Sequence, residues 1–184
     1  AVALRLFDQL AALDAGNVFR SARARRLLET AALCRSVAGS GRLGSRRKAA
    51  RRVRNRLPRL VEWRRPEIDV VALLVRRHAG RPPWLGDRRV AGLSTRERAT
   101  FLPLAAVLRL AVVLDAADPR GASGLRVRRT ARTFVIETRS ITEGPLAARL
   151  ALERAGLEVV LGRRVVVSPA VSLPRGARPA RTRA

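Results

Sequence analysis

Apolar residues recur at three- and four-residue spacing through the first two thirds of the chain, and this pattern predicts amphipathic helices. We expect helices over residues 1–14, 21–37, 45–57, 66–80 and 104–114. The last of these is almost entirely apolar, so we expect it to form the centre of the core. The segment 45–57 has residues that favour a helix but almost no apolar face. Together these segments predict a mostly α-helical domain over residues 1–118.

Glycine, proline and capping residues indicate where these helices begin and end. Three glycines in residues 39–44 are expected to break the chain, and residues 81–92 are expected to form a loop. Ser94 and Glu97 form a capping-box pattern that predicts a helix start. Pro103 is expected to kink or split the helix that follows.

The period changes from helical to alternating after a turn at residues 118–124. The expected order is two extended segments, a short helix and then one or two strands around Gly162 (125–128, 134–138, 145–156 and 157–167). This predicts a small β-β-α-β unit over residues 119–168, packed on the helical domain. Residues 169–184 have three prolines, four arginines and no periodicity, which predicts a disordered basic tail.

The net charge of +25 arises from 39 cations against 14 carboxylates, and only Lys48 is a lysine. This charge predicts a polyanionic partner, although a GC-rich gene would also favour Arg over Lys. One Cys excludes an internal disulfide, and one His argues against a zinc cluster. No apolar run reaches the length of a spanning helix, so we expect a cytoplasmic protein with no membrane contact. We also expect no cofactor. The missing initiator Met indicates a fragment, a processed chain or an out-of-frame start.

The cations are most concentrated at residues 42–65, where eleven of them face a single Glu. At 100° per residue, Arg47, Arg51 and Arg54 share one helix face, and Lys48 begins an adjacent one. We therefore expect a polyanion-binding site formed by Arg42, Arg46, Arg47, Lys48, Arg51, Arg52, Arg54 and Arg56. The alternative is a solvated face without a ligand. Polyphosphate and nucleic acid offer the same charge, but two Trp and no Tyr leave few platforms for stacked bases.

Three ordered runs, "LLETAAL", "RRHAGRPP" and "VLRLAVVLDAA", resemble the C-terminal HD-type helical domain of the exopolyphosphatase/guanosine-pentaphosphatase family. The resemblance covers about residues 1–167. It implies a helical HD-type fold, a long basic channel for polyphosphate and a share in a homodimer interface. It also implies that the catalytic, actin-like domain of such a protein lies outside this sequence.

The chain departs from the family pattern at the metal ligands. Cys34 and Arg35 replace the His-Asp pair, residues 46–48 read Arg-Arg-Lys where the family has His-His-Lys, and His78 and Asp115 remain. Two ligands do not hold a catalytic metal. We therefore expect no metal and no catalysis by this chain alone.

The resulting hypothesis is an accessory polyphosphate-binding domain. The alternatives are a basic nucleic-acid-associated protein and a dimerisation module with no ligand. We also expect Cys34 to be a buried helical residue, His78 to be structural and Asp115 to cap or pair with an Arg. Trp63 and Trp84 are expected to cover the core.

Overall fold

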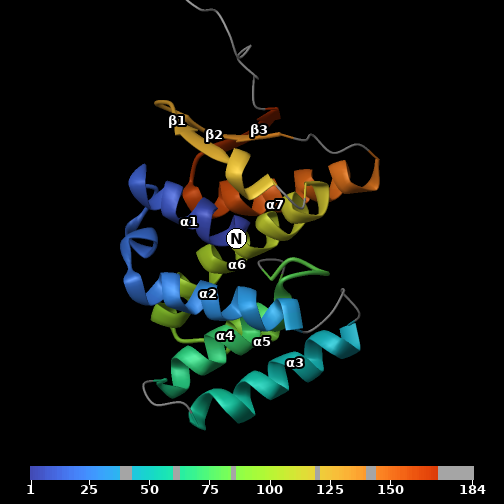
Figure 1. Ribbon diagram of the computed structural model, residues 1–184. Helices are drawn as coiled ribbons and strands as arrows, with labels where there is room; N and C mark the ends of the chain where they lie inside the picture. The colour runs from blue at the N-terminus through green and yellow to red at the C-terminus, as the bar shows by residue number, and fades with distance from the viewer. Residues whose placement is uncertain (38–42, 60–62, 84–85, 119–120, 140–143, 170–184) are drawn as a thin grey trace, which may run out of the picture.

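The computed structural model describes residues 1–37, 43–59, 63–83, 86–118, 121–139 and 144–169. Within these ranges the chain is mostly helical, with a three-stranded sheet at one end (Figure 1). This confirms the expected fold class, a mostly α protein with a small C-terminal β-β-α-β unit. Arg42, Trp84 and the predicted tail beyond Pro169 lie outside the described residues.

Helix α6 is the central element of the core, because its apolar residues contact helices on several sides. Its buried residues include Phe101, Leu104 and Leu108, and α1, α2, α4 and α7 all pack against it. The helices are α1 (Val2–Ala12), α2 (Ala22–Val37), α3 (Leu43–Arg56), α4 (Arg65–Arg77), α5 (Arg88–Ala91), α6 (Thr95–Ala117) and α7 (Pro145–Leu161).

The sheet has the order β1-β2-β3, with β1 (Arg126–Arg129), β2 (Thr133–Thr138) and β3 (Arg164–Pro169). Strands β1 and β2 pair antiparallel, whereas β2 and β3 pair parallel, with Phe134 opposite Val165. The parallel pair needs a crossover, which α7 supplies. Gln9 of α1 connects the helices to β1, since its side-chain amide donates to the Leu125 carbonyl at 2.9 Å.

The sheet and helix α3 lie at opposite ends of the molecule (Figure 1). Between them, α7, α6 and α1 lie nearer the sheet, and α2, α4 and α5 lie nearer α3. Helix α3 packs mainly on α4 and also touches α2. This arrangement leaves the opposite side of α3 open to solvent.

The predicted helical segment 45–57, which covers most of α3 and the first residue of the 3₁₀ turn after it, has an apolar face, contrary to expectation. Ala49, Ala50, Val53 and Leu57 are all less than 10% exposed and lie against the rest of the core. The expectation failed because two of the four are alanines, which look neutral in sequence but pack closely when two helices approach.

Several predicted boundaries are also wrong. Helix α3 begins at Leu43 and includes Gly44, and the expected loop 81–92 contains the short helix α5. Helix α6 continues through Pro103 without splitting, because the buried residues on both sides hold it in the core. Helix α7 extends to Leu161, so residues 157–161 are helical and only the segment after Gly162 is a strand.

Gly162 explains where α7 ends. Its φ of +60° is a left-handed conformation that favours glycine at a helix C-terminus. The apolar residues before it continue the helix because Gly156 and Leu157 are buried.

Among the described residues, α6 alone is long and apolar enough, by length and composition, to cross a membrane. Of its most apolar 18-residue window, 61% is buried inside the fold. The buried core helix of a soluble protein passes the same test, so this finding is weak evidence for a membrane span.

Candidate anion-binding surface

The outer side of α3 carries six exposed cations, which we call the α3 cationic face. These cations are exposed because the buried positions of α3 recur at three- and four-residue spacing, so the positions between them point to solvent. The helix has seven cations and no carboxylate. The members of the α3 cationic face are Arg47, Lys48, Arg51, Arg52, Arg54 and Arg56.

Arg54 has a carboxylate partner, whereas the other members of the α3 cationic face have none among the described residues. Its Nε lies 3.0 Å from an Asp69 carboxylate oxygen of α4, and Asp69 also contacts Arg65 at 3.5 Å. Like charges at this spacing on one helix repel each other by a few tenths of a kcal/mol per pair. The face therefore presents mostly uncompensated positive charge.

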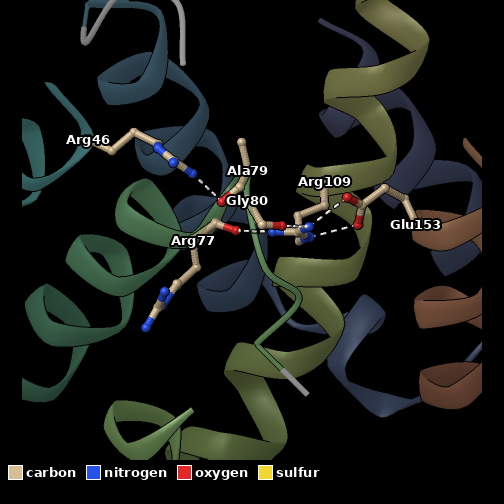
Figure 2. Close-up of polar contacts among 6 residues, drawn as sticks. All are labelled: Arg46, Arg77, Ala79, Gly80, Arg109 and Glu153. Carbon is tan, nitrogen blue, oxygen red and sulfur yellow. Dashed lines mark hydrogen bonds and ion pairs between the residues drawn. The ribbon is translucent and has the colours of Figure 1, made fainter. Parts of the chain in front are cut away.

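Arg46 does not belong to this face, which corrects its place in the predicted site. Only 7% of Arg46 is exposed, and its Nη1 donates to the Ala79 carbonyl oxygen (Figure 2). Burial, followed by the charges of Arg109, Arg77 and Arg149, lowers the pKa of Arg46. Arg46 is a structural cation that attaches α3 to the end of α4.

The Arg46 guanidinium lies beside a buried ion pair between α6 and α7 (Figure 2). Arg109 donates from Nε and Nη2 to the two Glu153 oxygens, at 2.7 and 2.6 Å, and both side chains are 1% exposed. Arg109 also donates to the carbonyl oxygens of Arg77 and Gly80, each at 2.7 Å. These bonds fix the end of α4 and so position α3 on it.

A hollow of about 330 Å³ lies between α3 and α4, and we call it the α3–α4 hollow. Five arginines line it and no carboxylate does: Arg47, Arg51 and Arg54 from α3, Arg76 from α4 and Arg89 from α5. Asn55, Ala50, Ala72 and Leu73 complete its lining. The three α3 arginines are the ones that the helical period placed on one face.

Arg76 and Arg89 were missed by the sequence reasoning. They lie outside the densest run of cations, and only the packing of α4 and α5 against α3 brings them beside it. Burial, followed by the charges of Arg89, Arg47 and Arg77, lowers the pKa of Arg76, while Asp87 acts in the opposite direction. The arginines that line the hollow therefore repel one another electrostatically.

The residues at which the sequence resemblance predicted remnants of a metal site are Cys34, Arg35, His78 and Asp115. Arg35 of α2 contacts Asp115 of α6 with a distance of 3.2 Å between Nη2 and Oδ2. His78 is 4% exposed, and its Nδ1 lies 2.7 Å from the Val75 carbonyl oxygen. Burial, together with the weaker effect of the Arg35, Arg46 and Arg109 charges, lowers the pKa of His78 to about 4, while the hydrogen bond to Val75 acts in the opposite direction.

This donor set does not fit a divalent cation. The Asp115 carboxylate is paired with a guanidinium, and positive charges surround the His78 ring. No group of three or more His, Cys, Asp or Glu side chains in the described part of the chain is placed to hold a metal ion. We therefore derive no chemistry through a metal here.

The remaining single residues occupy structural positions. Cys34 is half-buried against the core, and burial raises the pKa of its thiol. Trp63 also packs on the core, with the Arg26 guanidinium 4.6 Å from its ring centre. Asp115 thus pairs with an arginine and Trp63 packs on the core, as expected, whereas Cys34 is only half-buried where a buried residue was predicted.

Compared with models of known protein families and with curated proteins, the chain matches neither.

Proposed function

We propose that the chain binds a linear polyanion along the α3 cationic face, with inorganic polyphosphate as the ligand. The observation that carries this proposal is the set of exposed cations on one helix, five of which have no carboxylate partner among the described residues. Each pair of neighbouring like charges destabilises the helix slightly. A bound row of phosphates would remove that repulsion and release counterions, which makes binding favourable and salt-dependent.

The aromatic residues favour a polyanion without bases. Single-stranded nucleic acids bind by stacking on exposed rings. Here all four phenylalanines are buried, and the Trp63 ring packs on the core beneath Arg26. The described residues therefore present no open aromatic platform near α3. Duplex DNA, which is bound through its backbone without stacking, is the competing ligand that an experiment must distinguish.

We further propose an accessory role beside a catalytic domain that lies elsewhere. The resemblance to the exopolyphosphatase/guanosine-pentaphosphatase family motivates this role, and the charge arrangement is compatible with it. Where that family would place a metal ligand pair, Arg35 neutralises Asp115. Binding needs cations and no metal, so it would survive that substitution.

The test is a competition between long-chain polyphosphate and duplex DNA of equal total charge, measured by fluorescence anisotropy of a labelled DNA. We expect polyphosphate to displace the DNA at a lower charge concentration. Equal competition would reduce the proposal to nonspecific polyanion binding. No binding of either polymer at about 0.15 M salt would refute it.

The salt dependence of binding locates the site. Replacing Arg47 and Arg51 by Gln should lower the slope of log K against log salt by about 1.5, because each phosphate contact contributes roughly 0.7 to 0.9. A matched control replaces Arg126 and Arg132 by Gln, which removes the same charge from the exposed sheet end of the molecule. Equal slopes in the two variants would mean that the α3 cationic face is not the binding surface.

A further inference from the structure

The α3–α4 hollow is concave, whereas the α3 cationic face beside it is exposed to solvent. Its volume of about 330 Å³ equals roughly ten waters at about 30 Å³ each. An oxyanion and the start of its chain would fit in that space. The arginines reach the hollow from three helices, so one ligand group would contact α3, α4 and α5 together.

Arg76 has an unsatisfied donor at this place. Its Nε is buried and has no hydrogen-bond partner among the described residues. A buried donor without a partner is costly, because it has lost its water and gained nothing in exchange. The Nε of the neighbouring Arg77 is also buried without a hydrogen bond, but it lies within ion-pair distance of the Asp87 carboxylate.

Two carboxylates lie near the arginines that line the hollow. Asp69 pairs with Arg54, and the charge of Asp87 partly opposes the lowered pKa of Arg76. One Asp87 oxygen pairs with Arg77, and the other accepts the backbone N–H of Arg89 at 3.0 Å, which caps α5. Asp87 thus forms an ion pair with Arg77 and caps α5. Arg76, Arg89 and Arg47 remain as a cluster that lacks an anion.

A second hollow, of about 280 Å³, shares the lining residue Arg89 with the α3–α4 hollow. The two hollows therefore lie on either side of one arginine. Arg77, Arg81 and Arg88 also line the second hollow, together with Asp87. A ligand with several phosphates in a row could thus continue from one hollow into the next. A single phosphate would occupy the first hollow alone.

We propose that the α3–α4 hollow is a discrete oxyanion site, in which Arg76 and Arg89 bind one phosphate group of an inorganic oligophosphate. This inference rests on the proposed function. It identifies the place, beside the α3 cationic face, where the ligand is bound most tightly. Arg76 donates from its two terminal Nη groups to two oxygens of one phosphate, which is a bidentate geometry that arginine offers and lysine does not. Arg89 binds the same group from α5 and directs the rest of the ligand toward the second hollow.

Calorimetric titration with tripolyphosphate at constant ionic strength tests the site. We expect Arg76→Gln and Arg89→Gln each to lower the affinity at least tenfold. Arg52→Gln and Arg56→Gln remove the same charge from exposed positions of α3 that do not line the hollow, and they should lower it less than threefold. Arg76→Lys keeps the charge but loses the bidentate geometry, so it should resemble Arg76→Gln.

The outcomes separate this inference from the proposed function. If long polyphosphate binds but all four Gln variants weaken tripolyphosphate equally, the discrete site is refuted and the cationic face is retained. The same conclusion follows if long polyphosphate binds and tripolyphosphate does not. If neither ligand binds the wild-type protein, both proposals fail. Arg89 is exposed, so its variant tests the site even if Arg76→Gln impairs folding.

Discussion

Removing the charge of Glu153 should destabilise the whole fold. Arg109 uses two of its nitrogens on this carboxylate, and both side chains are 1% exposed (Figure 2). The substitution Glu153→Gln keeps the size of the side chain and one acceptor oxygen. It removes the negative charge that faces the buried Arg109 guanidinium, which also donates to the neutral carbonyls of Arg77 and Gly80.

The expected loss follows from the burial of this pair. Breaking a buried ion pair by removing one charge costs about 3–5 kcal/mol, because the remaining charge stays desolvated. For a chain of this length, about 1 kcal/mol corresponds to roughly 2–4 °C in Tm. Glu153→Gln should therefore lower the Tm by roughly 6–20 °C.

Urea unfolding followed by circular dichroism measures this loss. The control is Asp14→Asn, which removes a carboxylate from an exposed pair with Arg20, 60% and 59% exposed, and keeps a residue that tolerates the positive φ at this position. It should change stability by less than about 1 kcal/mol. A Glu153→Gln loss as small as that of the control would refute the assigned burial of the pair.

A double variant tests the coupling between the two residues. Arg109→Met with Glu153→Leu removes both buried charges, so it should be less destabilised than the sum of the single variants by at least about 1 kcal/mol. It should still be less stable than the wild type, because the carbonyls of Arg77 and Gly80 lose a donor. Strict additivity would mean that the two side chains do not interact.

Three further outcomes are expected. Gly80→Ala should cost about 1–2 kcal/mol in urea unfolding, because Gly80 has a φ of +82° and a Cβ there would lie 3.0 Å from an Arg46 nitrogen; an unchanged midpoint would contradict this. The pKa of His78 is about 4 in the fold against about 6.5 unfolded, so the unfolded state binds more protons. Stability should fall by about 2 kcal/mol as the pH drops from 6.5 to 5, and His78→Leu should remove that slope between these pH values. Affinity per phosphate should rise from inorganic phosphate to longer oligophosphates because Arg89 joins two hollows, and equal affinities would argue against a continuous track.

The features that depend on local sequence were predictable. Ser94 and Glu97 form the expected capping box, with the Ser94 backbone N–H donating to a Glu97 carboxylate oxygen at 2.7 Å. The two bonds of a capping box lie within four residues, so no distant contact is needed to form them. The β-β-α-β order was predictable for the same reason, since alternation and a helix-starting proline are both local signals.

The candidate site was predictable only in part. The helical period correctly placed Arg47, Arg51 and Arg54 together, but it could not show that Arg46 points inward. Adjacent arginines look equivalent in sequence, and the difference arises only because the Ala79 carbonyl lies beside α3. Arg76 and Arg89 were unpredictable because they come from two other helices.

The position of Arg109 in an apolar helix is a sequence signal for a buried ion pair. Arg109 is the one charged residue between Leu104 and Leu114, and an ion in so apolar a helix must find a partner or lie at the surface. Sequence could not name that partner, because Glu153 lies 44 residues away on α7. The packing of α6 on α7 decides the pairing, and no local pattern contains that information.

The pair between Arg35 and Asp115 joins α2 to α6 at two positions that the sequence analysis singled out. Their positions are 80 residues apart, and the expectation that Asp115 pairs with an arginine is confirmed, although its partner could not be named in advance. The Arg35 guanidinium is held partly buried, with 26% of the side chain exposed, so it neutralises the carboxylate without a bound ion. The charges of Arg35, Arg46 and Arg109 act together with burial to lower the pKa of His78, so this part of the interior disfavours a further positive charge.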